Sequence, residues 1–179
     1  DRRVAGQHHL PGGLEARDVP MYEAVVLKVW VYIIADADIK ALFVANRDIY
    51  NKLEPFFPSA PMLEKVILMD GSGPDTLAGL EEKGAAAPVP AKQPDSSTIG
   101  VLIYTSGTTG DPKGVLLSQG NLSSNSHARI KKFHQFDENE RTLNILPWAH
   151  VYGLGEMITF CQIGASVGLA ENVTTISED

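Results

Sequence analysis

The chain has 179 residues, of which 44% are apolar and 21% are charged, and its formal net charge is −7. This length suits one domain with a sizeable core, and the apolar content excludes a wholly disordered chain. The acidic balance argues against non-specific nucleic-acid binding, which needs clustered basic residues. The single cysteine, Cys161, excludes an intrachain disulfide framework and a multi-cysteine metal site, and it favours a reducing compartment.

The N-terminal residues lack the pattern of a signal peptide. The longest apolar run, residues 24–35, is interrupted by Lys28 and is too short to span a bilayer, so we expect a soluble protein. Residues 1–18 are expected to be irregular. The adjacent His8 and His9 fit a solvated tail better than a metal site, because no further ligand lies nearby. Both ends are treated as candidate fragment boundaries.

From Pro20 onward, apolar segments alternate with amphipathic ones. The segment 24–36 is ambiguous, because its β-branched residues favour a strand and its length favours a helix. The following segments predict a strand at 41–44, a helix at 47–53 that ends before Pro55 and Pro58, a strand at 65–69 and a helix at 77–83. Residues 84–97, rich in Ala, Pro and Ser, predict a surface linker.

Beyond this linker, the pattern predicts strands at 99–104 and 115–117, a helix capped by Ser118 or Asn121 that runs to about Phe133, a strand at 142–146, a helix at 154–162 and a strand at 166–169. Strands separated by helical stretches predict an α/β fold, with a mainly parallel sheet covered by helices on both faces. Ligands of such sheets bind at the carboxyl ends of strands, which directs attention to the residues after Tyr104.

A predicted buried strand leads into Thr105-Ser106-Gly107-Thr108-Thr109-Gly110-Asp111-Pro112-Lys113-Gly114. Glycines let backbone N–H groups approach an anion, the hydroxyls add donors, and Lys113 adds a positive charge. The segment therefore predicts a phosphate site. On composition alone, a surface turn rich in Ser, Thr and Gly explains it equally well.

The segment is neither a Walker A loop nor a dinucleotide-binding loop. Pro112 takes the place of the second Walker glycine, and Gly71-Ser72-Gly73 and Gly153-Leu154-Gly155 both lack the third glycine of G-x-G-x-x-G. Phosphoryl transfer to a substrate hydroxyl therefore has no motif support.

As a whole, Tyr104-Thr105-Ser106-Gly107-Thr108-Thr109-Gly110-Asp111-Pro112-Lys113-Gly114-Val115 resembles the phosphate-binding signature of the AMP-forming adenylating enzymes, which include the acyl-CoA synthetases. Leu146-Pro147-Trp148-Ala149-His150-Val151-Tyr152-Gly153 is similar to their Pro-x-x-His segment of the acyl-binding wall, as found in long-chain fatty-acid:CoA ligases. Segments 19–23, 32–36 and 41–44 resemble the same subfamily, although residues 24–29 depart from its usual polar helix start. The resemblance implies that residues 19–179 are a partial AMP-binding domain, without the family's small C-terminal domain.

The resemblance implies an ATP-dependent ligase that converts a fatty acid, of long-chain type, to acyl-AMP and then to acyl-CoA, with release of pyrophosphate and AMP. ATP, Mg²⁺ and coenzyme A would be required. The implied phosphate contacts are Thr105, Ser106, Gly107, Thr108, Thr109, Gly110, Lys113 and Gly114, and the implied acid pocket is Trp148, His150, Tyr152 and Gly153. Lys113 and His150 would be the catalytic residues. No metal ligand is assigned to the protein.

Tyr152-Gly153-Leu154-Gly155-Glu156 imitates the family's adenine motif, Tyr-Gly-x-Thr-Glu, but it directly continues the His150 segment and is assigned to that segment. His150 itself could be a buried structural histidine, which is the usual role of a lone histidine beside aromatic residues.

Two alternative functions stay open: an adenylate-forming ligase for a different carboxylic acid, and a non-catalytic remnant that binds a partner or a nucleotide. The adenine motif, the ribose-binding aspartate, the hinge and the C-terminal lysine of the family are not found in this chain, so we expect the chain alone to be inactive. A location in the cytoplasm or at the cytosolic face of a membrane is expected, with membrane association left open and no nucleic-acid partner.

Overall fold

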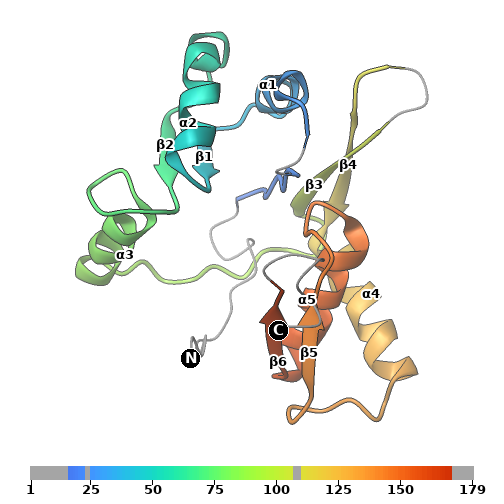
Figure 1. The fold of residues 1–179 in the computed structure, drawn as a ribbon. Helices are drawn as coiled ribbons and strands as arrows, with labels where there is room; N and C mark the ends of the chain where they lie inside the picture. Colours follow the sequence, from blue (N-terminus) through green and yellow to red (C-terminus); the bar gives the residue numbers. More distant parts are fainter. Residues whose placement is uncertain (1–15, 23–24, 107–109, 171–179) are drawn as a thin grey trace. The chain divides into compact units, whose positions relative to one another are not determined.

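The computed structural model describes residues 16–22, 25–106 and 110–170, and the chain divides into two compact units. Unit 1 comprises residues 1–22, 91–105 and 113–179, and unit 2 comprises residues 23–90 and 106–112. Each unit has its own helices and strands (Figure 1). His8, His9 and the predicted phosphate contacts Gly107, Thr108 and Thr109 lie outside the described residues.

Unit 2 contains a parallel strand pair with helices before, between and after its strands. Its elements are α1 (Leu27–Asp36), β1 (Ala41–Val44), α2 (Arg47–Leu53), the 3₁₀ helix η2 (Glu54–Ser59), β2 (Lys65–Leu68) and α3 (Leu77–Ala86). β1 and β2 pair in parallel, with Ala41 opposite Lys65. The connection through α2 and η2 supplies the long crossover that a parallel pair requires.

The ambiguous segment 24–36 is a helix from Leu27 onward. Trp30, Ile33 and Ile34 are its buried residues, and this spacing places all three on one face. The β-branched residues of this segment disfavour a helix only slightly. Burial of that face outweighs this preference and stabilises the helix.

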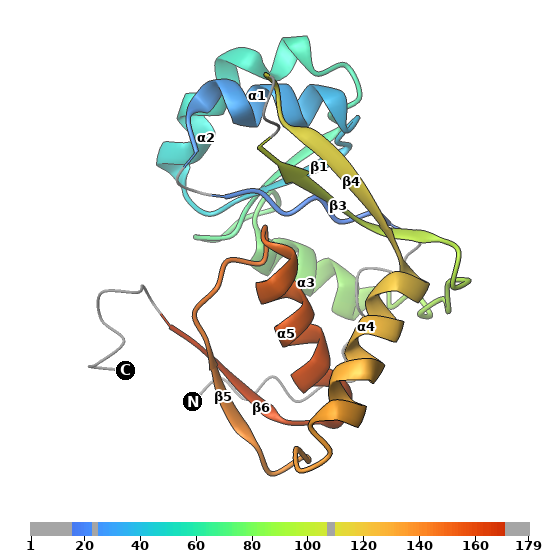
Figure 2. The same cartoon turned by 90° about the vertical axis from the view of Figure 1, so that its right-hand side faces the viewer.

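Unit 1 contains an antiparallel hairpin, two long helices and a parallel strand pair. Its elements are β3 (Ile99–Thr105), β4 (Lys113–Ser118), α4 (Gln119–Lys132), β5 (Arg141–Asn144), α5 (Val151–Ile163) and β6 (Ser166–Leu169). β5 and β6 pair in parallel, with Arg141 opposite Ser166. α5 crosses between these two strands in the sequence, and it packs against both of them and against α4 (Figure 2).

Ser118 and Asn121 together start α4. The Ser118 hydroxyl accepts a hydrogen bond from the Asn121 backbone N–H at 3.1 Å, and the Asn121 side chain accepts one from the Ser118 backbone N–H at 3.0 Å. This is a capping box, which satisfies backbone donors that the first helical turn leaves free. Both residues that the sequence offered as caps therefore take part.

The structure confirms the α/β fold class, and it differs from the expected sheet in one place that matters for the site. β3 and β4 pair antiparallel, with Thr105 opposite Lys113. Residues 106–112 are too few for the crossover that two parallel strands need, whereas a hairpin accepts a short connection. Among the described residues, the strands form three separate two-stranded ladders rather than one continuous sheet.

A buried core joins β3 to α5. Val101 and Ile103 of β3 pack with Leu154 and Ile158 of α5, and all four side chains are buried. Asp18 adds a backbone bridge to the outer edge of β3: its N–H donates to the Gly100 carbonyl and its own carbonyl accepts from Leu102 N–H, both at 2.9 Å. Thus β3 has hydrogen-bond partners on both edges.

The 84–97 segment begins within α3, which continues to Ala86, and the chain resumes regular structure at Ile99. In the part of the chain that the structure describes, no helix has the length and apolar character needed to cross a bilayer.

Candidate functional site

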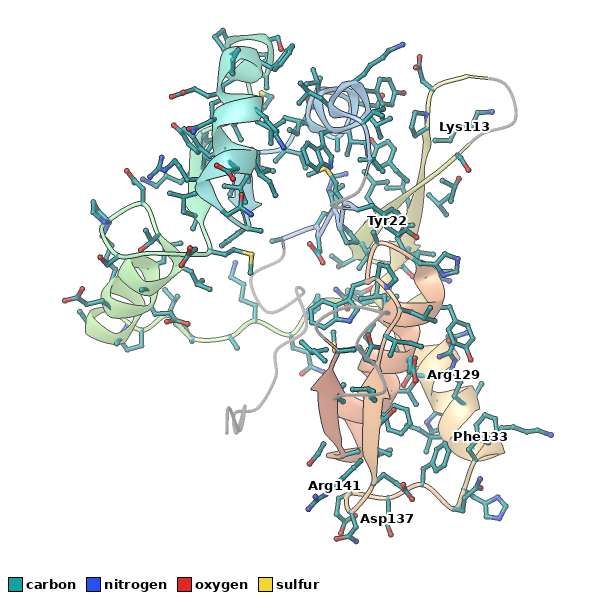
Figure 3. All side chains as sticks on the ribbon, in the orientation of Figure 1. Tyr22, Lys113, Arg129, Phe133, Asp137 and Arg141 are labelled. Atoms are coloured by element: carbon teal, nitrogen blue, oxygen red, sulfur yellow. The ribbon has the colours of Figure 1, made fainter. Side chains whose placement is uncertain are left out.

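The hairpin places the two ends of the predicted phosphate segment in register. Thr105 ends β3 opposite Lys113, which begins β4, and the Thr105 hydroxyl donates to the Lys113 carbonyl at 3.5 Å. Both residues are exposed, and the described residues form no ion pair with Lys113 (Figure 3). An exposed hydroxyl and an unpaired cation at the end of one hairpin are chemically suited to an anion.

The other phosphate candidates flank or continue this hairpin. Ser106 is exposed directly after β3. Gly110 has φ of +135°, a backbone conformation that a residue with a Cβ adopts only with strain. Gly114 lies in β4, where a Cβ would stand 2.9 Å from Leu102 Cδ1 and 3.2 Å from Tyr104 Cζ, so the glycine leaves room for these two side chains.

His150 is the residue that begins α5. It is exposed, and its Nδ1 accepts a hydrogen bond from the Tyr152 backbone N–H at 3.1 Å. Its own backbone N–H donates to the Pro147 carbonyl at 3.0 Å. His150 is therefore neither buried nor a core histidine: it caps the helix. Because a neutral imidazole carries one proton, an accepting Nδ1 leaves the proton on Nε2 as a donor.

Asn144, which the sequence analysis did not single out, ties the His150 segment together. This residue is only 4% exposed, and its Nδ2 donates to the Gly153 carbonyl at 3.4 Å while its Oδ1 accepts from Trp148 Nε1 at 3.3 Å. Asn144 thus links the predicted pocket residues Trp148 and Gly153 from the end of β5. A buried polar residue without such partners would be costly, so both bonds are expected to be kept.

Gly153 allows a close approach between α5 and the chain that precedes it. A Cβ at this position would lie 2.7 Å from the Pro147 carbonyl oxygen and 2.8 Å from that of Leu146. These are backbone atoms, so the neighbour could not move aside cheaply. The glycine is therefore needed to fold the Pro-x-x-His segment back against its own helix.

Arg129 of α4 is a second residue that the sequence analysis missed. Its guanidinium carbon lies 5.0 Å from the centroid of the Tyr152 ring, within the range of a cation–π interaction. Since Trp148 and Tyr152 are both exposed, the predicted acid segment presents two aromatic side chains and an imidazole at one end of α5. No spacing or motif in the sequence indicates this contact, because α4 and α5 meet only in the fold.

A buried core joins the strand that leads into the predicted phosphate segment to the helix that begins at His150. β3 leads into the phosphate segment and α5 begins at His150, and these two elements share the cluster formed by Val101, Ile103, Leu154 and Ile158. No hydrogen bond or ion pair between Lys113 and His150 is found in the described residues. The described part of the chain also contains no group of three His, Cys, Asp or Glu side chains that could hold a metal ion.

The chain belongs to the AMP-binding enzyme family, whose pattern matches residues 14–179. The match confirms the family resemblance of Tyr104–Val115 and of the His150 segment. It does not by itself assign a role to any of their residues.

Among characterised relatives, the chain is 31% identical over 164 residues to the long-chain-fatty-acid–CoA ligase FadD15 of Mycobacterium bovis, a match that covers 88% of this chain and 27% of that protein. It is 47% identical over 70 residues to the sulfoacetate–CoA ligase of Cupriavidus necator, covering 39% of this chain and 13% of that protein. The chain thus spans about a quarter or less of the length of these relatives.

Among solved structures, the anthranilate CoA ligase AuaEII, determined in complex with anthranoyl-AMP, superposes with a TM-score of 0.79. This match has 23% identity and covers 93% of this chain and 32% of that protein. At this identity the likeness shows the fold, which is that of the adenylate-forming CoA ligases.

Proposed function

We propose that the complete protein carrying this chain is an ATP-dependent acyl-CoA ligase. A carboxylate oxygen of the acid attacks the α-phosphorus of ATP, the bond to the bridging oxygen breaks, and pyrophosphate leaves. The sulfur of coenzyme A then attacks the acyl carbonyl, the thiol loses its proton, and AMP leaves. The observation that carries the proposal is the single buried core that joins the strand before the phosphate segment to the helix that begins at His150.

The first step needs charge neutralisation and orientation more than proton transfer. The attacking carboxylate is already an anion, so no general base is required, and two anions must be held together. Lys113, exposed and without an ion pair in the described region, supplies the positive charge. The hydroxyl of Ser106, and that of Thr105 once it exchanges its 3.5 Å bond to the Lys113 carbonyl for a phosphate oxygen, would supply neutral donors, and the residues up to Gly110 with Gly114 would leave space for the phosphate oxygens.

Mg²⁺ would arrive bound to the phosphates of ATP. Its role would be to neutralise charge on the phosphate oxygens. The described residues supply no acidic cluster for it, so our proposal assigns its binding to ATP and leaves the protein's part to Lys113 and the hairpin donors.

His150 and its neighbours would receive the acid. With Nδ1 occupied by the Tyr152 N–H, the imidazole offers its Nε2–H to a carboxylate oxygen. Trp148 and Tyr152 add exposed aromatic surface on either side in the sequence, and Gly153 keeps the segment close to α5. These residues are suited to orient a carboxylate beside an apolar group.

We propose a long-chain fatty acid as the substrate. The support is the similarity to the ligase FadD15 over most of this chain, together with the sequence resemblances at 19–23, 32–36 and 41–44. Relatives named for sulfoacetate and anthranilate show that the same fold accommodates acids of other chemistry. Sulfoacetate and anthranilate are therefore the alternative substrates to compare with a fatty acid in a test.

The test is acid-dependent exchange of labelled pyrophosphate into ATP, measured on the complete protein with palmitate, sulfoacetate and anthranilate. We expect exchange with palmitate at the highest kcat/KM, followed by acyl-CoA formation when coenzyme A is added. Exchange with another acid instead of palmitate would support the proposed ligase activity and contradict a long-chain fatty acid as the substrate. No exchange with any of these acids would contradict the proposed activity and favour a binding remnant.

A further inference from the structure

The guanidinium of Arg129 lies against Tyr152 and Gly155 of α5. Its Cζ is 5.0 Å from the centroid of the Tyr152 ring. At Gly155, three residues further along the same helix face, a Cβ would lie 3.3 Å from Arg129 Nη2 and 3.5 Å from Cζ. The guanidinium therefore lies close against Gly155, where a Cβ would require it to shift by a few tenths of an ångström.

Arg129 differs from the other cations at the end of α4. It is half-buried, whereas Lys131 and Lys132 are exposed. Within the described residues the ion pairs are Lys40–Glu64 and Lys65–Asp75, so Arg129 has no carboxylate partner there. Its charge is directed at an aromatic ring, an arrangement that gains strength as the cation loses contact with water.

Tyr152 contacts both Arg129 and His150. The ring of Tyr152 lies under Arg129, and the backbone N–H of the same residue donates to His150 Nδ1 at 3.1 Å. The ring and the amide belong to one residue in the first turn of α5, so Arg129 can act on the amide by restricting where Tyr152 lies in that turn. A shift of the Tyr152 backbone would break the hydrogen bond to Nδ1 and free the imidazole to rotate.

We propose that Arg129 is a positioning residue for the acid substrate: by holding Tyr152 from α4, it keeps His150 in the orientation that presents Nε2–H to the carboxylate. This inference rests on the proposed function, since His150 meets the acid only in that reaction. Asn144 makes two further hydrogen bonds to the His150 segment, through Trp148 and Gly153.

The experiment compares Arg129→Gln with Lys132→Gln in the complete protein, using pyrophosphate exchange. Both variants remove one positive charge from the last turn of α4, but only Arg129 lies over a ring. We expect Arg129→Gln to raise the KM for the acid roughly threefold to tenfold, with the KM for ATP within about twofold of wild type. Lys132→Gln should leave both KM values unchanged.

The Gly155→Ala variant distinguishes an effect of Arg129 on the acid KM from an effect on the stability of the protein. Alanine favours a helix more than glycine does, so this variant should unfold at the same or a higher temperature than wild type. Its Cβ nevertheless pushes against the guanidinium, and we expect a higher KM for the acid. A purely structural role for Arg129 predicts an unchanged acid KM in this helix-stabilised variant.

Variants of Tyr152 test whether Arg129 changes the acid KM through the Tyr152 ring. With Tyr152→Leu, the ring is gone and Arg129→Gln should cause no further rise in the acid KM. With Tyr152→Phe, the ring remains and Arg129→Gln should again raise it. Equal effects in both backgrounds, or an unchanged acid KM in Arg129→Gln, would overturn the positioning role. Absence of exchange in the wild type would instead overturn the proposed function, so the two failures are distinguishable.

Discussion

At the residue scale, two carboxyl groups show how local environment sets protonation in this protein. Asp18 is fixed by its backbone bridge to β3, and partial burial raises the pKa of its carboxyl, an effect that a hydrogen bond from the Val19 backbone partly offsets. In Asp75, the hydrogen bond from Lys65 and then the charge of that lysine lower the carboxyl pKa. The two groups should therefore give stability opposite dependences on pH.

For Asp18, the folded protein binds the proton more tightly than the unfolded chain does. The free energy of unfolding should therefore fall as pH rises from the ordinary carboxyl pKa through the raised folded pKa. Asp18→Asn removes this titration, so the variant should gain stability relative to wild type as pH rises through that window. Urea unfolding between about pH 3 and pH 7 measures the difference.

Asp75→Asn is the matched control with the opposite sign. The stabilisation from an ionised Asp75 is present above the unfolded carboxyl pKa and is lost as pH falls through the lowered folded pKa. This variant should therefore differ from wild type at neutral pH and converge with it in acid. An Asp18→Asn variant with the same pH slope as wild type would contradict the burial argument for Asp18.

Individual site residues were predictable only where they belong to a local pattern. Lys113 and His150 stand in contiguous segments that resemble a family signature, so the sequence identifies them as candidates. Asn144 and Arg129 act on the His150 segment through contacts between β5, α4 and α5, and no spacing in the sequence announces such contacts. The assigned roles of all four residues stay predictions until they are tested.

At the element scale, the capping box at the start of α4 has a measurable value. Ser118→Ala removes the hydroxyl that accepts the Asn121 N–H, and we expect a loss of about 1 kcal/mol in the free energy of unfolding. Ser124→Ala is the control, because that hydroxyl donates to the Asn121 carbonyl in the middle of the same helix and caps nothing. Equal losses in the two variants would mean that the cap contributes no specific stability.

Helix and strand positions followed from local pattern, whereas strand direction required a chain-length argument. The predicted helix at 47–53 and the strand at 166–169 occur with those bounds, because prolines and turn residues mark their ends. The sequence predicts a mainly parallel sheet, and β3 and β4 are an antiparallel exception, since the connection at 106–112 is too short for a crossover. The sequence contained this signal, and counting the connecting residues would have predicted the hairpin.

The helix at 24–36 shows a limit of local reasoning. Residue propensity and segment length gave opposite predictions for it, and the deciding factor is the burial of Trp30, Ile33 and Ile34 on one face. Burial depends on the partner surface, which a single segment does not contain. The choice between helix and strand at this position is therefore a property of the packed unit.

At the scale of the whole molecule, apolar side chains of β4 are exposed, and the chain spans only part of the length of its relatives. Val115 and Leu116 of β4 are 45% and 54% exposed, and the region aligned with FadD15 is 27% of that protein. The predicted domain, residues 19–179, stays a prediction, while the family match begins at residue 14. Activity is therefore assigned to the complete protein.

We propose that the β3–β4 hairpin binds the phosphates of ATP through Lys113. The most direct measurement is acid-dependent pyrophosphate exchange by Lys113→Ala in the complete protein, with Lys131→Ala, an exposed lysine of α4, as the control. Because a preorganised charge on the transferring phosphate is removed, we expect the exchange rate to fall roughly 100-fold or more, with the KM for the acid nearly unchanged and the control at the wild-type rate. Exchange by Lys113→Ala at the wild-type rate would contradict the claim.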